Sequence, residues 1–438
     1  MGTPNPWDLN VVGFPSQSEV FAGAIEMVHY WPGKCASHSA CEMPHNTPLP
    51  TRILDLGLDS SSTITLRESR GTTGRYICLN TFKIARALGV QYDDWQREAG
   101  RMADVYRNSY LTMAATWGNS PETGCFSKPS DGVRHGTVMM YATEHPTELR
   151  DERLLAPRVL HFGRQEMIWE CSKMTACECG LNYVVGNGIS KKSFFGFISE
   201  FKTTVDTTPQ SVWAEVVADY SSLQLSYSRD KLSALSGLAD EMRRHGGQEY
   251  LAGLWRDTLV LDMCWHRPKW YNTTPPRPPS EYRAPTWSWA SLNGPVELDR
   301  TLYTGDRTRE RAAKELARVL DAKRFPSGPS ATGEVKDGFV TLRCSLIRAS
   351  FEKNKICFDY QHVGGQPGER CRSFNWYDDH TCEMDENGEY YIIPLASCNL
   401  FLGRHTLHWL VVKRRTQGST EKIRFNSSAE TLDQVTIV

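Results

Sequence analysis

Residues 93–116 read DDWQREAGRMADVYRNSYLTMAAT and combine a helix cap, an amphipathic stripe and a strand without interruption. Asp93 or Asp94 suits the N-cap position, and Gln96 stands three residues after Asp93, the spacing of a capping box. Apolar residues then recur at helical intervals, at Trp95, Ala99, Met102 and Tyr106. Residues 110–116 follow as a short strand. A helix that leads directly into a strand predicts part of an α/β domain.

The sequence just before this segment has too few residues to form the strand that an α/β sheet needs between two helices. Residues 64–66 and 75–79 read as strands, and residues 81–88 read as a helix that Gly89 would end. Val90, Gln91 and Tyr92 alone separate that helix from the cap at Asp93. A strand of about five residues does not fit in this interval. We therefore expect an incomplete sheet.

The remaining chain divides into a helical segment and a β-rich part. Residues 158–162 and 167–170 predict a hairpin, and residues 211–223, 230–244 and 249–266 have helical periodicity. After a proline-rich run, Trp287-Ser288-Trp289 predicts a strand that buries one of its tryptophans, and residues 307–323 predict a charged helix. Further strands are expected at 339–346, 390–395 and 408–412. The predicted organisation is an irregular segment (1–50), an α/β domain (51–200), a helical segment (201–272) and a β-rich C-terminal region (280–438).

Five blocks of the sequence carry a resemblance to a known family. They are Leu49–Asp55, Asp94–Thr116 with the following Gly124, Cys125 and Phe126, Glu152–Phe162, Asp230–Leu238 and Ala284–Ser291. In their order they resemble the fungal heterokaryon-incompatibility (HET) domain. The resemblance implies an α/β domain of TIR-like, flavodoxin-like type.

Three motifs of that family are absent here. A Tyr-Trp-Gly motif would follow the strand at 75–79, and a Trp-Ile-Asp strand with a Cys-Ile-x-Gln segment would precede Asp93. The chain instead runs from Asn80 into Thr81 and from Tyr92 into Asp93. A Gly-Trp-Thr-x-Gln motif before Glu152 is replaced by residues 147–151. The resemblance therefore predicts a sheet with two neighbouring strands left unpaired.

The resemblance implies a role in non-self recognition and programmed cell death, triggered when a protein partner of unknown identity is sensed. A rival hypothesis is an NAD-hydrolysing, TIR-like enzyme with Glu98 or Glu152 as a general acid or base. A surface or capping carboxylate is the favoured interpretation of both glutamates, and the enzyme hypothesis rests on fold-level analogy. The third hypothesis is a zinc-binding interaction module.

The hydrophobic content and the net charge of the chain limit the kinds of molecule that we expect it to bind. The 438 residues are 40% hydrophobic, which suffices for buried cores, and 50 Lys and Arg against 51 Asp and Glu give a net charge of -1. This balance gives no support for a nucleic-acid or anionic-membrane partner. The sequence shows no signal peptide and no apolar run that approaches the ~18 residues of a membrane span. We expect a cytoplasmic protein without a cofactor.

Cysteine usage fits the same compartment. The 13 cysteines are odd in number and scattered, so we interpret them as mostly reduced and buried. Cys35, His38 and Cys41 are spaced like zinc ligands, but three ligands are too few for a closed structural site. The favoured interpretation is a loop without metal. A second group contains Cys171, Cys177 and Cys179, and a site drawn from both groups is the alternative.

Overall fold

The computed structural model separates the chain into two units by its internal contacts: residues 1–91 with 101–196, and residues 92–100 with 197–438. We call them the N-terminal and the C-terminal unit. The structure describes residues 30–38, 41, 47–50, 52–55, 65–68, 71–80, 101–115, 152–162, 167–177, 191, 194, 196–197, 208–223, 228–268, 281–303, 313–352, 355–359, 370–373, 389–399, 405–413, 425–426 and 433–437.

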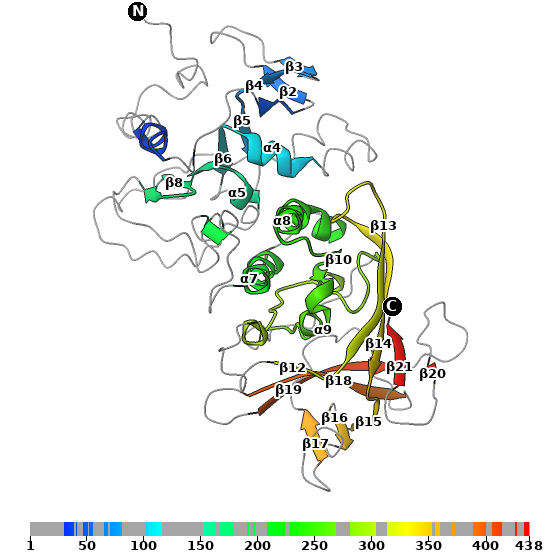
Figure 1. Cartoon of the computed structure of the whole chain (residues 1–438). Helices are drawn as coiled ribbons and strands as arrows, with labels where there is room; N and C mark the ends of the chain where they lie inside the picture. The colour runs from blue at the N-terminus through cyan, green and yellow to red at the C-terminus, as the bar shows by residue number, and fades with distance from the viewer. Residues whose placement is uncertain are drawn as a thin grey trace, which may run out of the picture. The chain divides into compact units, whose positions relative to one another are not determined.

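A five-stranded mixed sheet forms the centre of the N-terminal unit (Figure 1). Its strands, in spatial order, are β5 (Ile77–Asn80), β6 (Leu111–Ala115), β7 (Arg158–Phe162), β8 (Met167–Cys171) and β9 (Thr175–Cys177). The β5–β6 and β6–β7 pairs are parallel, and the β7–β8 and β8–β9 pairs are antiparallel. The structure thus confirms a mixed α/β architecture and the predicted hairpin.

Strand β6 has a hydrogen-bonded neighbour on each side. Ile77 of β5 lies opposite Leu111, and Thr112 lies opposite Val159 of β7. The unpaired gap expected between β5 and β6 is therefore not present. The reason is that β5 pairs directly with β6, so their backbone groups bond to each other without an intervening strand.

Helix α4 (Met102–Asn108) leads into β6, as the sequence predicts, but it begins at Met102. Arg101 occupies the N-cap position, and its side chain does not cap the helix. The predicted cap at Asp93 and the residue Trp95 lie outside the described residues. Tyr106 is buried, and the Tyr76 hydroxyl donates to the carbonyl oxygen of Val105 at 2.6 Å. That bond ties the helix to the residue preceding β5.

The two faces of the β7–β8 hairpin carry different chemistry, because successive side chains point to opposite faces. One face contributes Leu160, Phe162 and Trp169 to an apolar cluster that also contains Cys171. The other face carries His161 and Glu170. All five residues of β7 are buried, so both faces are covered.

Short helices and strands complete the described part of the N-terminal unit. Helix α5 (Glu152–Leu155) precedes β7. Strand β1 (Thr47–Pro48) pairs with β4 (Thr73–Gly74), and β2 (Arg52–Asp55) pairs with β3 (Thr65–Glu68), both antiparallel. Residues 65 and 66 of the strand predicted at 64–66 belong to β3, which continues to Glu68, and residue 64 lies outside the described residues.

Two of the predicted helices occur in the C-terminal unit. Helix α7 (Pro209–Ser221) begins after a capping box between Thr208 and Ser211. Helix α8 (Lys231–Gly246) follows the turn η4 (Ser228–Asp230) and ends at Gly247, whose φ of 66° is left-handed. In Figure 1 both helices lie on the same side of the long β13–β14 ribbon as α9.

The helix predicted at 249–266 is wrong over most of its length. The residues form a tight hairpin of β10 (Tyr250–Leu251) and β11 (Leu254–Trp255), then the turn η5 (Arg256–Thr258) and the short helix α9 (Leu259–Asp262). The hairpin turns at Ala252 and Gly253, with φ of 48° and 99°. A Cβ at Gly253 would lie 2.6 Å from Nε1 of Trp289, so glycine meets both the backbone and the packing requirement.

The segment Trp287-Ser288-Trp289 is not a strand. It enters the turn η6 (Trp289–Ser291), which the Ser288 hydroxyl caps by accepting from the N–H of Ala290. Both tryptophans are buried, not one of the pair as predicted. The alternation of apolar and polar residues therefore reflects a buried turn. A further short turn, η7 (Arg300–Leu302), follows.

Antiparallel sheets form the rest of the C-terminal unit. One has the order β12-β18-β15-β16-β17, with β19 paired to β18, and the other has the order β13-β14-β21-β20. Their bounds are β12 (Lys314–Glu315), β13 (Arg318–Pro326), β14 (Val335–Cys344), β15 (Ile347–Glu352), β16 (Lys355–Asp359), β17 (Arg370–Ser373), β18 (Tyr390–Asn399), β19 (His405–Lys413), β20 (Phe425–Asn426) and β21 (Asp433–Ile437). The predicted β-rich region is confirmed.

The charged helix predicted at 307–323 is wrong over its described part, which lies in β12 and β13. Strand β13 is at the end of its sheet and most of its side chains are exposed. Charged side chains suit such an edge because they discourage pairing with another chain. The charge pattern that suggested a solvated helix belongs to a solvated strand.

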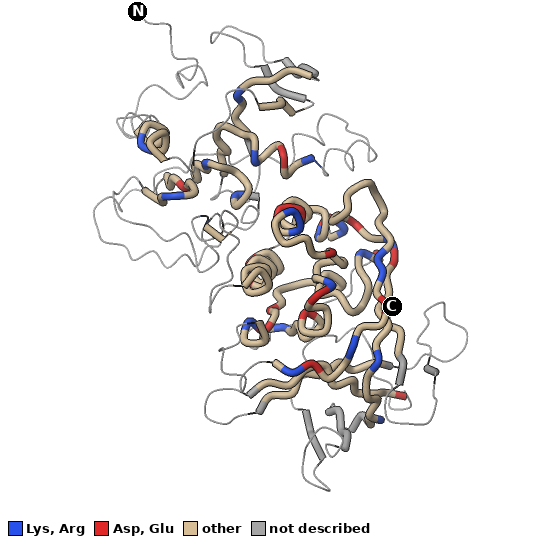
Figure 2. Tube along the Cα trace, in the orientation of Figure 1, with Lys and Arg blue, Asp and Glu red and all other residues tan. Residues whose placement is uncertain are grey.

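Acidic and basic residues are interspersed along the described elements of both units (Figure 2). Among the described residues, no helix has the length and apolarity that crossing a bilayer requires.

Candidate metal centre

Four side chains in the N-terminal unit bring metal-ligating atoms together: Cys35, His38, Cys41 and Cys171. Their ligand atoms all lie within 4.8 Å of one another. Nδ1 of His38 lies 3.8 Å from Sγ of Cys41 and 3.8 Å from Sγ of Cys171. The three cysteines are buried and His38 is partly exposed. We call these residues the thiol–imidazole cluster.

Local backbone hydrogen bonds place the first three ligands. Residues 30–35 are helical, and the N–H of His38 then donates to the carbonyl of Cys35 at 3.0 Å. The N–H of Cys41 donates to the carbonyl of His38 at 2.9 Å. Each bond spans three residues, which turns the ligands toward a common side. The C-x-x-H-x-x-C spacing thus becomes a three-ligand arrangement through local turns.

Cys171 comes from the end of strand β8, 130 residues away from Cys41. Its N–H donates to the carbonyl of Met174 at 2.9 Å, which closes the turn into β9. Its side chain shares a face of β8 with Trp169, and the Trp169 ring stacks on Trp31 with the centroids 6.2 Å apart. Apolar packing therefore holds the N-terminal segment against the strand that provides the fourth ligand.

Arg158 and Ser172 form a second layer around the sulfur atoms. Arg158 donates from Nε to Sγ of Cys35 at 3.3 Å and from Nη2 to the carbonyl of Cys41 at 2.6 Å. Its Nη1 donates to the carbonyl of Tyr110, just before β6. The Ser172 hydroxyl lies 3.0 Å from Sγ of Cys41. Arg158 thus connects β7, the residue before β6 and the N-terminal segment around the thiols.

The thiols of Cys35 and Cys41 have shifted pKa values. Hydrogen bonding with Cys171 and then with Cys35 lowers the pKa of the Cys41 thiol to about 2. Hydrogen bonding with Cys171 and with Cys41 raises the pKa of the Cys35 thiol above its usual range, and burial adds to that rise. The cluster therefore stabilises a thiolate, which is the form of cysteine that binds metals.

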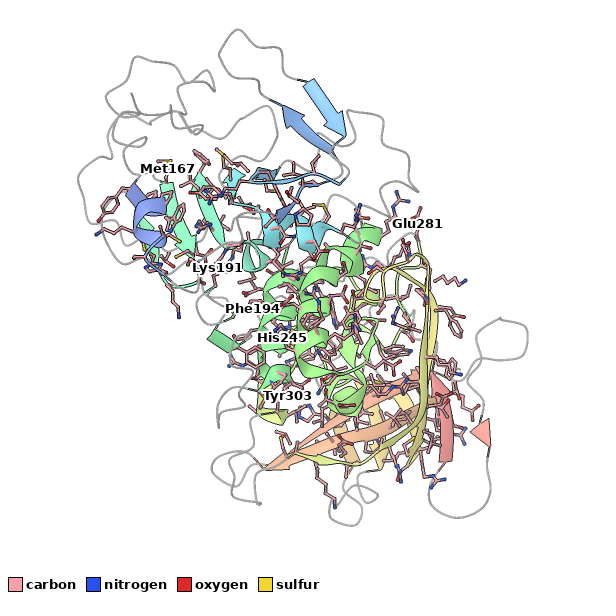
Figure 3. All side chains as sticks on the ribbon, turned by 45° about the horizontal axis from the view of Figure 1, so that its top comes forward. Met167, Lys191, Phe194, His245, Glu281 and Tyr303 are labelled. Carbon is pink, nitrogen blue, oxygen red and sulfur yellow. The ribbon has the colours of Figure 1, made fainter. Side chains whose placement is uncertain are left out.

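A buried charge network lies on the opposite face of β8. Oε1 of Glu170 accepts from Nη1 of Arg153 at 2.5 Å and from the backbone N–H of Lys191 at 3.3 Å. Oε2 of Glu170 lies 3.3 Å from Nε2 of His161. Nζ of Lys191, which is labelled in Figure 3, lies in this network. It donates to the carbonyl of Ala156. This network connects α5, β7, β8 and Lys191.

Opposing effects set the pKa values in this network. Burial acts to raise the pKa of Glu170, but the Arg153 guanidinium and the hydrogen bond from His161 outweigh it and hold the pKa below its usual range. Burial lowers the pKa of Lys191 to about 7 against the attraction of Glu170. Burial also lowers the pKa of His161. The carboxylate is ionised and its neighbours supply the compensating charge.

The residues predicted as site candidates have different outcomes. Cys35, His38 and Cys41 are brought together with Cys171, so the structure supplies the fourth ligand that the local spacing lacked. Cys177 is the last residue of β9, and its side chain and all of Cys179 lie outside the described residues. Glu152 is the first residue of α5, and Glu98 lies outside the described residues, so their suggested catalytic role stays a prediction.

The pairing with Cys171 was one combination of two cysteine groups in the sequence. The hairpin prediction placed Cys171 directly after a strand, but no local signal indicated which sheet face would meet residues 30–41. The charge network on the other face was not predicted. The sequence feature that could have predicted it is the position of Glu170 and His161 within apolar strands, because buried charged groups need partners.

Comparison with known proteins gave no matching family model, no matching curated protein and no matching solved structure.

Proposed function

We propose that this protein is a HET-type protein of fungal non-self recognition, and that its N-terminal unit corresponds to the unit that signals growth arrest or cell death after a protein partner is sensed, but lacks motifs which that signalling needs. The proposal is carried by the order of the five HET-like blocks in the sequence. Block 94–116 includes α4 and β6, and block 152–162 includes α5 and β7.

The arrangement of these elements supports the proposal. Parallel strands require a crossover connection, and β5, β6 and β7 are consecutive parallel neighbours in chain order. Helix α4 lies in the connection between β5 and β6, and α5 lies in the connection between β6 and β7. An α/β domain of the proposed kind is built from such units.

Direct pairing of β5 with β6 changes what the missing motifs imply. Two strands with unpaired backbone groups would cost about 1 to 3 kcal/mol for each buried group, enough to unfold a domain. Because the strands pair with each other, loss of the motifs need not unfold the unit. We expect a folded N-terminal unit that lacks the sequence elements that complete HET domains possess.

Inducible expression in a fungal host tests the proposal. The chain as it stands should be tolerated, whereas a version with the three missing motifs restored should arrest growth. A third version, restored and carrying Arg153→Leu, should be tolerated, because the substitution leaves Glu170 buried without its strongest partner. Expression levels of the three proteins are compared by immunoblot.

Two results would count against the proposal. Tolerance of the restored version in every tested strain would remove the support for a HET-type role. Arrest by the chain as it stands would show that the missing motifs are dispensable and would locate the activity in the elements that remain. If arrest occurs, cellular NAD measured with and without Glu152→Gln separates an enzymatic from a non-enzymatic mechanism.

A further inference from the structure

The thiol–imidazole cluster has the composition and dimensions of a closed zinc site. Structural zinc sites use four cysteine or histidine ligands, with Zn–S bonds of about 2.3 Å and Zn–N bonds of about 2.0 Å. A tetrahedron with such bonds separates its ligand atoms by about 3.5 to 3.8 Å. In the structure Nδ1 of His38 lies 3.8 Å from Sγ of Cys41 and 3.8 Å from Sγ of Cys171, and all ligand atoms lie within 4.8 Å of one another.

We propose that Cys35, His38, Cys41 and Cys171 bind one structural Zn²⁺ ion, which fastens residues 30–41 to the end of strand β8. The proposal goes beyond the HET-type function and is independent of it. Three thiolates and one imidazole favour zinc over hard cations such as Mg²⁺ or Ca²⁺. All four positions are filled by protein ligands, which assigns the ion a structural role and not a catalytic one.

The surroundings of the sulfur atoms match the charge of the loaded site. Zn²⁺ with three thiolates and a neutral imidazole carries a net charge of about -1, and a buried site needs an opposite charge nearby. Arg158 provides it, since its Nε donates to Sγ of Cys35 at 3.3 Å. The Ser172 hydroxyl is placed to donate to Sγ of Cys41 at 3.0 Å. Such outer contacts orient ligands in metal sites.

The ion would join parts of the chain that are distant in sequence. Within the apolar cluster of the N-terminal unit, residues 30–41 contribute Trp31, Cys35 and Cys41, while Trp169 and Cys171 come from β8. A metal ion that binds only the folded arrangement of these segments adds its binding free energy to folding. Removal of the ion should therefore release residues 30–41 before the sheet itself unfolds.

Metal content and cobalt spectroscopy of the full chain test the proposal. We expect one equivalent of zinc by elemental analysis, and the visible absorption of tetrahedral cobalt thiolate after replacement with Co²⁺. Cys171→Ser should lose at least about tenfold in zinc affinity. The matched control is Cys264→Ser, which removes another buried, free cysteine that lies outside the cluster.

Substitutions of the partly exposed His38 keep the test decisive if Cys171→Ser does not fold. His38→Cys retains four ligands and should retain zinc, with a shifted cobalt spectrum, whereas His38→Ala should lose zinc. Absence of zinc and cobalt binding in the wild-type chain would overturn the proposal. So would full zinc affinity in both Cys171→Ser and His38→Ala.

Limited proteolysis tests the fastening role. Lys34 is exposed within the segment, so trypsin can reach it once the segment is released. A chelator should accelerate cleavage after Lys34 by at least about tenfold, and added Zn²⁺ should restore protection. Equal cleavage rates with and without chelator would show that the ion does not hold this segment. None of these readouts depends on growth arrest, so their failure is distinct from failure of the HET-type proposal.

Discussion

The buried charge of Glu170 in the N-terminal unit is compensated by other charged side chains, whereas the buried charges of Lys231 and Arg283 in the C-terminal unit are compensated by backbone carbonyls. Glu170 has Arg153 and His161 as side-chain partners. By contrast, Nζ of Lys231 donates to the carbonyl of Leu292 at 2.5 Å, and Nε of Arg283 donates to the carbonyl of Ala290 at 2.7 Å. Backbone partners are present whatever the neighbouring side chains are. The N-terminal unit should therefore be more sensitive to single substitutions of charged residues.

The largest expected effect follows from removing the shared carboxylate. Glu170→Gln leaves Arg153 and Lys191 buried without a counter-charge, and loss of one member of a buried charge pair costs about 3 to 5 kcal/mol. Hydrogen exchange in β7 and β8 should report this loss as faster opening of the N-terminal unit. The control is Glu249→Gln, because Glu249 is exposed and Arg256 is partly exposed, so that this pair should contribute less than about 1 kcal/mol. Equal effects of the two substitutions would refute the comparison.

An intermediate effect is expected where the C-terminal unit depends on close packing. Gly253→Ala places a methyl group 2.6 Å from the Trp289 indole at a residue with φ of 99°. Overpacking and backbone strain together should lower the free energy of unfolding by about 2 to 4 kcal/mol. Chemical denaturation, followed by tryptophan fluorescence, measures this change.

Gly247→Ala is the matched control for this substitution. Gly247 also has a left-handed φ, 66°, but a Cβ there meets nothing within 4 Å. It should therefore cost only about 1 to 2 kcal/mol, the strain of the backbone alone. If Gly253→Ala costs no more than Gly247→Ala, the indole is not packed against Gly253 as described.

The smallest effect concerns Asp262, a buried carboxyl with a dependence on pH. Burial raises its pKa to about 7, against the hydrogen bonds donated by the Trp255 N–H and the Tyr303 hydroxyl. In the unfolded chain an aspartate ionises near pH ~3.9. Between these values the folded state holds a proton that the unfolded state has released. The free energy of unfolding should therefore fall by about 1 to 3 kcal/mol as pH rises from about 4 to 7.

Asp262→Asn should remove that part of the pH dependence. The amide oxygen can accept from the Trp255 N–H while the amide nitrogen donates to the Tyr303 oxygen, so the variant keeps both contacts. Denaturation midpoints measured at several pH values for both proteins give the slope. An unchanged slope in the variant would assign the pH dependence to other groups.

Local patterns predicted the elements that depend on local interactions. The hairpin at 158–170 and the helices α7 and α8 occur near their predicted positions because periodicity, caps and end signals agreed there. The helix predicted at 249–266 failed because a left-handed turn at Gly253 interrupts it, and that turn packs closely against the distant Trp289. Apolar spacing alone does not distinguish these cases.

Only the ligands of the candidate site that are close together in the sequence could be predicted. The spacing of Cys35, His38 and Cys41 indicated ligands, and their local turns follow from it. Cys171 joins them because Trp31, Cys35 and Cys41 pack in one apolar cluster with Trp169 and Cys171 of β8, and Cys171 is 130 residues from Cys41 in the sequence. The pairing of β5 with β6 is likewise a tertiary result: the absence of family motifs between them predicted a gap that direct pairing removes.

Glu170 and Cys171 are consecutive residues whose side chains lie on opposite faces of β8. This limits the insertions and deletions that the β7–β8 hairpin can tolerate. Because side chains alternate along β8, a shift of register by one residue would place the carboxylate among the thiols and the sulfur among the charged groups. Mutations that lengthen or shorten the connection between β7 and β8 are acceptable only if the pairing of Val159 with Glu170 is retained. In sequences that descend from this chain, Glu170 and Cys171 should therefore be retained or replaced together. Arg153 and the C-x-x-H-x-x-C motif should change with them.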